Sequence, residues 1–222
     1  MGSSRDRWPG WAGIAFVVLF IVGFFTLVLR SAPDPNASTA SFTAFVADSA
    51  KRHQAVAGMF LLALAALAFL WFVVGLHARL RSAEGEPAQM SRLALASGIV
   101  YVVILSVAAA TITVAPAGVV FGPTPVPNGD LIRELFQLGF VMLLVFGLIP
   151  VALLIAITSA LAIKKRALPG WLGPVGFVLA AVQLIAAPIF PAAFALPLWV
   201  LLVSIVLLMP SGSVGDSPSS LG

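Results

Sequence analysis

One long apolar stretch constrains this chain more than any other feature. The 33 residues from Leu131 to Ile163 contain two charged side chains, and the basic residues 164–166 follow them directly. A helix of that length is about 50 Å long, whereas the hydrocarbon layer of a bilayer is about 30 Å thick. The stretch therefore predicts a membrane-crossing helix whose first two turns, Leu131 to Gln137, project at the outer surface, unless Pro150 breaks the helix.

The composition of the whole chain supports a membrane protein. Of its 222 residues, 61% are hydrophobic and only 9% are charged, whereas a soluble domain carries about 25% charged residues. The net charge of +4 comes from few residues at the ends of apolar runs. It therefore indicates membrane topology and not a surface for nucleic acid. The absence of cysteine excludes disulfides and thiolate metal sites.

Five further apolar runs predict an all-α, polytopic bundle of six transmembrane helices. We expect one membrane domain over residues 11–209, between a cytoplasmic N-terminus at 1–10 and a disordered tail at 210–222. The first run has 19 residues, more than the about 7–15 of a signal peptide, and is therefore interpreted as a retained anchor. The fifth and sixth runs are short, so the predicted number of spans depends most on whether this hairpin crosses the membrane. The predicted spans are about 11–29, 54–76, 93–114, 131–163, 171–187 and 192–209.

The connecting segments differ in character. Within the polar residues 31–53, the helical spacing of Phe42, Phe45 and Val46 predicts a short helix in the membrane interface, with Ser41 as its N-cap. Residues 77–92 are predicted to form a polar loop. Residues 115–129 are dense in Pro and Gly and are predicted to be irregular.

The distribution of Lys and Arg predicts that both termini face the cytoplasm. With the N-terminus inside and six spans, eight basic residues lie on the inner side and four on the outer side. The inner residues are Arg5, Arg7, Arg79, Arg81, Arg92, Lys164, Lys165 and Arg166; the outer residues are Arg30, Lys51, Arg52 and Arg133.

A candidate polar layer lies near the membrane midplane and consists of Ser106, Pro150 and Gln183. Pro150 has no N–H to donate to the carbonyl of Phe146, and an unpaired carbonyl is costly in lipid. We therefore expect the Gln183 amide, at the same depth, to donate to that carbonyl. Such a patch is structural in the simpler interpretation and a transporter-like substrate site at a broken helix in the alternative. The layer contains no ionisable group for coupling to an ion gradient.

A second candidate is an outward-facing polar mouth. It would combine Asp48, His53, Arg133, Glu134 and Gln137, provided that the second and fourth spans are neighbours. The simpler interpretation is a solvated helix end, in which Asp130 caps the fourth span.

No catalytic, cofactor or metal site is predicted. His53 and His77 lie at opposite ends of one span, about 36 Å apart by helical rise, so they cannot share a haem or a metal on that helix. The zinc-protease and serine-hydrolase motifs His-Glu-x-x-His and Gly-x-Ser-x-Gly do not occur. The remaining hydroxyl groups are expected to bond to their own helix backbones; they belong to Thr111, Thr113, Thr158, Ser159 and Ser204.

Three short segments carry a resemblance. They are residues 66–72 (ALAFLWF) with Glu84–Gly85 shortly after, residues 168–173 (LPGWLG) and residues 195–200 (ALPLWV). With them the chain resembles uncharacterised six-span bacterial integral membrane proteins of a domain-of-unknown-function type, over most of residues 11–209. The resemblance implies a fold type and a bacterial inner-membrane location, and it carries no activity and no site residue.

These observations predict a multi-pass plasma-membrane protein that binds or scaffolds partners through its helices without catalysis. The alternative is a small-solute transporter or channel with a midplane site near Pro150 and Gln183. The expected partners are membrane lipids and, further, other membrane proteins or a second copy of the chain, and not nucleic acid.

Overall fold

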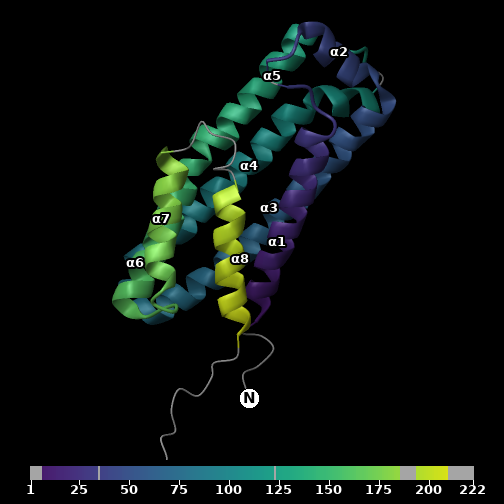
Figure 1. Cartoon of the computed structure of the whole chain (residues 1–222). Coiled ribbons are helices and arrows are strands. Elements are labelled where there is room, and N and C mark those ends of the chain that lie inside the picture. The colour runs from purple at the N-terminus through teal and green to yellow at the C-terminus, as the bar shows by residue number, and fades with distance from the viewer. Residues whose placement is uncertain (1–6, 35, 123, 186–193, 210–222) are drawn as a thin grey trace, which may run out of the picture.

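The computed structural model describes residues 7–34, 36–122, 124–185 and 194–209, in which every regular element is a helix (Figure 1). Four helical segments are long and apolar enough to cross a membrane, namely Trp8–Leu27, Ser49–Glu84, Gln89–Phe121 and Gly129–Lys165. The chain is therefore a multi-pass helical membrane protein. The elements are α1 Trp8–Phe24, the π-helical turn η2 Phe25–Leu29, α2 Thr39–Ala47, α3 Ser49–Glu84, α4 Gln89–Phe121, α5 Gly129–Val141, the π-helical turn η3 Met142–Phe146, α6 Leu148–Lys165, α7 Leu172–Ile185 and α8 Ala195–Leu208.

The helices pack side by side, with α1 between α3 and α8 and with α4 between α3 and α6 (Figure 1). The α7 helix packs mainly against α6, and α8 packs mainly against α1. Each of the six predicted spans overlaps a helical segment, and four of these segments are long and apolar enough to cross a membrane. At 14 residues each, α7 and α8 are only about 21 Å long, so the described part of neither helix reaches across the hydrocarbon.

Glycine allows the closest helix contacts, as lipid-embedded bundles require. A Cβ atom on Gly58 of α3 would lie 2.7 Å from Cβ of Leu27 and 3.0 Å from the carbonyl oxygen of Gly23. One on Gly98 of α4 would lie 2.5 Å from Cγ1 of Val73 on α3. A larger residue at either position would therefore push two helices apart.

Aromatic rings fill the space between α1, α3, α4 and α8. The ring centroids of Phe16 and Phe69 lie 4.8 Å apart, and those of Phe69 and Tyr101 lie 5.2 Å apart. Phe72 meets the buried Trp199 of α8 edge to face at 6.1 Å. These contacts attach α8 to the centre of the bundle.

Two predicted loops are shorter than expected. The α3 helix continues to Glu84 and α4 begins at Gln89, so most of the predicted polar loop 77–92 is helical. The α4 helix also continues to Phe121 with Pro116 inside it, which makes the prediction of an irregular segment 115–129 wrong over its first seven residues. Proline removes one backbone bond, and membrane helices tolerate that loss where neighbours compensate.

The predicted interfacial helix exists as α2, but Ser38 and not the predicted Ser41 is its N-cap. Ser38 precedes the helix with an extended backbone, and its Oγ accepts from the backbone N–H of Ser41. Ser41 itself lies in the first turn and cannot cap it. Phe42 is fully buried on α2, and its ring centroid lies 5.7 Å from that of Phe136 on α5.

Pro150 does not break the long fourth helix. Gly129–Lys165 is continuous, and its irregularity is the π-helical turn η3, where the N–H of Gly147 donates to the carbonyl of Met142 at 2.8 Å. The turn ends four residues before Pro150. The predicted ends of spans five and six at 186–187 and 192–193, the segment 1–6 and the tail 210–222 lie outside the described residues.

Candidate functional site

The midplane candidates do not form a three-member layer. Ser106 is exposed on α4, and its hydroxyl donates to the carbonyl of Val102 at 2.8 Å. Pro150 is half-buried on α6, and Gln183 of α7 is 0% exposed. The interior position of Gln183 agrees with the prediction, whereas Ser106 points away from it.

The packing of α7 on α6 places Gln183 level with Pro150. Gly173 faces Ile163, and Gly176 faces Ser159 and Ile155, so the two helices run antiparallel in a fixed register. Continuing that register by two helical turns places Gln183 beside the turn around residue 150. Both its amide oxygen and its amide nitrogen are buried there without a hydrogen-bond partner.

The expected hydrogen bond from Gln183 to the carbonyl freed by Pro150 is therefore not formed. The face of α6 toward α7 contains Ile155 and Ser159, and Leu148 continues that face. Phe146 lies in the π-helical turn before α6, and the residue is 57% exposed. The Gln183 amide therefore remains without the partner expected for it.

Three residues of the predicted outer mouth, Asp48, His53 and Arg133, make local contacts. The Asp48 carboxylate caps α3 by accepting from the N–H groups of Ala50 at 2.9 Å and Lys51 at 3.2 Å. The ring Nδ1 of His53 lies 2.7 Å from the Ser49 carbonyl oxygen of the same helix.

Three of the five mouth residues belong to α5. Arg133 forms an ion pair at 3.4 Å with Asp130 of the same turn, and Glu134 and Gln137 are exposed. At this end α2 packs against both α3 and α5 (Figure 1), and Thr39 of α2 donates to Asp130 at 2.7 Å. A polar mouth shared by the second and fourth spans is therefore replaced by a helix packed between them.

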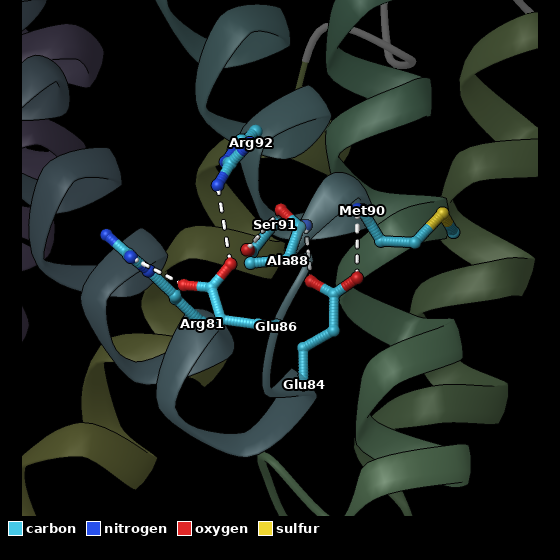
Figure 2. Close-up of polar contacts among 7 residues, drawn as sticks. All are labelled: Arg81, Glu84, Glu86, Ala88, Met90, Ser91 and Arg92. Carbon is cyan, nitrogen blue, oxygen red and sulfur yellow. Dashed lines mark hydrogen bonds and ion pairs between the residues drawn. The ribbon is translucent and has the colours of Figure 1, made fainter.

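The turn between α3 and α4 is a compact polar site at the opposite end of the bundle (Figure 2). The Glu84 carboxylate accepts from the backbone N–H groups of Met90 at 2.9 Å and Ser91 at 2.8 Å. Glu84 therefore satisfies two of the free N–H groups at the start of α4. Burial raises the pKa of the Glu84 carboxyl, but these hydrogen bonds outweigh it and hold the pKa below its ordinary value of 4.5.

Two arginines hold the second carboxylate of this turn. The Glu86 carboxylate lies 2.7 Å from Nη2 of Arg81 and 3.5 Å from Nη2 of Arg92 (Figure 2). The hydrogen bond from Arg81 is the largest cause of a pKa for Glu86 below its ordinary value. On the interior side of the turn, Nδ1 of His77 lies 2.9 Å from the Ser91 carbonyl oxygen.

A second cluster of cations lies nearby and has no carboxylate partner among the described residues. Nε of Arg79 donates to the carbonyl of Ala167 at 3.1 Å, which joins α3 to the segment after α6. Two clefts of about 410 Å³ and 460 Å³ share Arg79, Arg166 and Ala167 in their lining. The sequence placed Arg79 and Arg166 on one side of the membrane, but no local pattern indicated a common cleft.

The exposed tryptophans gather at this same end. Trp8 and Trp71 meet edge to face with centroids 5.6 Å apart, Trp11 lies one turn further along α1, and Trp171 precedes α7. Tryptophan prefers the membrane–water interface, so these side chains mark the level at which this end leaves the hydrocarbon.

The predicted hydrogen bonds from hydroxyl groups to their own helix backbones are confirmed at four of five positions. They run from Thr111, Thr113, Thr158 and Ser159 to the carbonyls four residues earlier. Ser204 is the exception, because its buried Oγ has no hydrogen-bond partner and faces Gly13 of α1.

Within the described ranges, no group of three or more His, Cys, Asp or Glu could hold a metal ion.

Comparison with protein-family models, with curated proteins and with solved structures finds no match to this chain. The resemblance to six-span bacterial membrane proteins therefore stays a prediction.

Proposed function

We propose that this chain is a six-span protein of the bacterial plasma membrane, with both termini inside, that binds partners through a rigid helix bundle without catalysing a reaction. The observation that carries the proposal is the apolar packing of the described interior, to which the unpaired side chains of Gln183 and Ser204 are exceptions. Phe, Leu and Ala fill the interior, and the buried hydroxyls of Thr113, Thr158 and Ser159 are bonded to their own helices. Such an interior stabilises a fixed shape and offers few groups to a passing solute.

The charges at the two ends support the proposed orientation. One end has seven basic and two acidic described residues, and the other has four of each. Excess Lys and Arg mark the cytoplasmic side. The basic end contains Arg7, Arg79, Arg81, Arg92, Lys164, Lys165 and Arg166 with Glu84 and Glu86; the neutral end contains Arg30, Lys51, Arg52 and Arg133 with Asp34, Asp48, Asp130 and Glu134.

Single-cysteine labelling tests both the orientation and the span count, because the chain has no native cysteine. In intact cells a membrane-impermeant maleimide should label Ala187→Cys and Asn36→Cys but not Ser82→Cys. After permeabilisation all three should react. Labelling of Ser82→Cys from outside would overturn the orientation. Labelling of Asn36→Cys without Ala187→Cys would reduce the crossings to four with a hairpin that turns back inside the membrane.

One observation favours the alternative of small-solute transport. Gln183 places an unpaired amide in the interior beside Pro150, and a buried amide without partners costs about 1–3 kcal/mol. A group retained at such a cost is a candidate for binding a polar solute at the midplane.

Proteoliposomes distinguish the two functions. The scaffold proposal expects no solute flux above protein-free vesicles for a panel of sugars, amino acids and polyols. It also expects Gln183→Leu to unfold at the same or a higher temperature, since an apolar side chain removes the unpaired amide. Flux that Gln183→Leu abolishes and Gln137→Leu leaves intact would overturn the scaffold proposal in favour of transport.

A further inference from the structure

The cations at the basic end fall into two groups. Arg81 and Arg92 share Glu86. Arg79 and Arg166 form no ion pair with any described carboxylate, although they line the same two clefts. Two positive charges are therefore held together in a concave surface without a counterion from the described chain.

One hydrogen bond positions the guanidinium of Arg79, and the chain turns at Arg166 beside it. The hydrogen bond from Nε of Arg79 to the Ala167 carbonyl holds the guanidinium and leaves its two terminal nitrogens available. Arg166 ends α6 in a left-handed conformation with φ of 52°. Guanidinium groups bind phosphate through paired, parallel N–H donors, so a phosphate is the ligand whose charge and geometry this arrangement fits.

Apart from Ser82, the rest of the cleft lining is apolar. Ala162, Ile163, Leu168 and Pro169 line the first cleft together with the arginines. Trp8, Pro9 and Leu207 line the second cleft. A ligand bound here would place an anionic group beside the guanidinium groups and hydrocarbon along the helices.

The depth of the clefts in the membrane suits a ligand that has both an anionic group and a hydrocarbon chain. Trp8, which lines the second cleft, contacts Trp71, and both rings mark the membrane–water interface. Ile163, which lines the first cleft, is 52% exposed on the surface of α6. The clefts therefore open where lipid headgroups and the first acyl carbons lie.

We propose that the clefts around Arg79 and Arg166 bind an anionic phospholipid through its phosphate, with an acyl chain along Ile163. Basic sites between helix ends at the cytoplasmic surface recognise such headgroups. The inference goes beyond the proposed scaffold function, and it depends neither on the orientation in the membrane nor on whether α7 and α8 both cross.

A matched pair of double variants tests the site. Arg79→Gln with Arg166→Gln removes two positive charges from the clefts, and Arg81→Gln with Arg92→Gln removes two from the neighbouring turn. Native mass spectrometry of protein in mixed micelles measures retained phosphatidylglycerol against phosphatidylcholine at equal mole fraction. We expect the first pair to lose about tenfold in preference for phosphatidylglycerol, from the loss of two basic contacts, and the second pair to lose less than about twofold. Equal loss in both pairs, or no preference in the unaltered protein, would overturn the proposal.

Protection of a cysteine from alkylation tests the same site in folded protein without the arginine substitutions. Ser82 lines the second cleft, so phosphatidylglycerol should slow the alkylation of Ser82→Cys at least threefold relative to phosphatidylcholine. The control Ser49→Cys at the neutral end should react at the same rate with either lipid. Equal protection of Ser82→Cys by inorganic phosphate would assign the site to free phosphate, and no protection by either ligand would refute it.

Discussion

The two ends of the bundle are closed by different kinds of contact. At the basic end, carboxylates bind backbone N–H groups and arginines, whereas at the neutral end a short helix packs an apolar ring against the bundle. Glu84 binds two N–H groups of α4 at the basic end, and Glu86 joins two arginines. At the neutral end α2 inserts Phe42 beside Phe136. The α3–α4 turn is too short to carry a hydrophobic cap, so polar contacts close it. The longer connection before α3 contains enough residues for a helix of its own.

From this comparison we expect the largest loss of stability from Phe42→Ala. Phe42 is fully buried, and truncating a buried phenylalanine costs about 3–5 kcal/mol. We expect α2 to detach, with loss of amide hydrogen-exchange protection over residues 39–47 and a lower unfolding temperature in detergent. Phe121→Ala, which removes a 64% exposed ring, serves as the control. Equal effects of the two variants would mean that α2 is not an apolar cap.

At the basic end, Glu84→Gln should destabilise less. The neutral amide still reaches one backbone N–H but loses the charge that two N–H groups share, and a lost helix cap costs about 1 kcal/mol. The measurement is hydrogen exchange at Met90 and Ser91, which should accelerate while α2 stays protected. Faster exchange at both ends would show that the ends are coupled and would contradict separate closure.

Acid should destabilise the turn between α3 and α4 by protonating the Glu84 carboxylate. The folded pKa of Glu84 lies below its ordinary value of 4.5, so its stabilisation is complete above about pH 4.5 and is lost as the pH falls through the folded value. We expect the exchange protection of Met90 and Ser91 to fall below about pH 4.5, after correction for intrinsic exchange rates. Glu84→Gln should flatten that dependence, and an unchanged dependence in this variant would assign the titration to another group.

The smallest effect is expected from Arg92→Gln. Its contact with Glu86 is 3.5 Å long, and both side chains are mostly exposed to solvent. Water screens such pairs strongly, so the unfolding temperature should change less than in Arg81→Gln, which removes the 2.7 Å contact. A larger effect of Arg92→Gln would mean that Arg92 stabilises the turn through another contact.

The apolar runs predicted the helices because lipid leaves the backbone no partner other than itself. The same reason explains why the first part of the predicted irregular segment 115–129 is helical, since Pro116 removes one hydrogen bond and not the helix around it. The environment of Gln183 could not be predicted, because a depth estimate gives the level of a residue and not the side of the neighbouring helix that it faces. Arg79 and Arg166 share clefts through a contact between segments 88 residues apart, for which a single sequence gives no signal.

The four exposed tryptophans have a consequence for how the molecule responds to bilayer thickness. All of them lie at the basic end, where their rings resist both deeper burial and transfer to water. We expect the basic end to stay at the same depth in bilayers of different thickness. The depth of the neutral end should then change as the opposite leaflet becomes thicker or thinner. Tryptophan quenching by lipids brominated at one depth should then stay constant as the acyl chains lengthen.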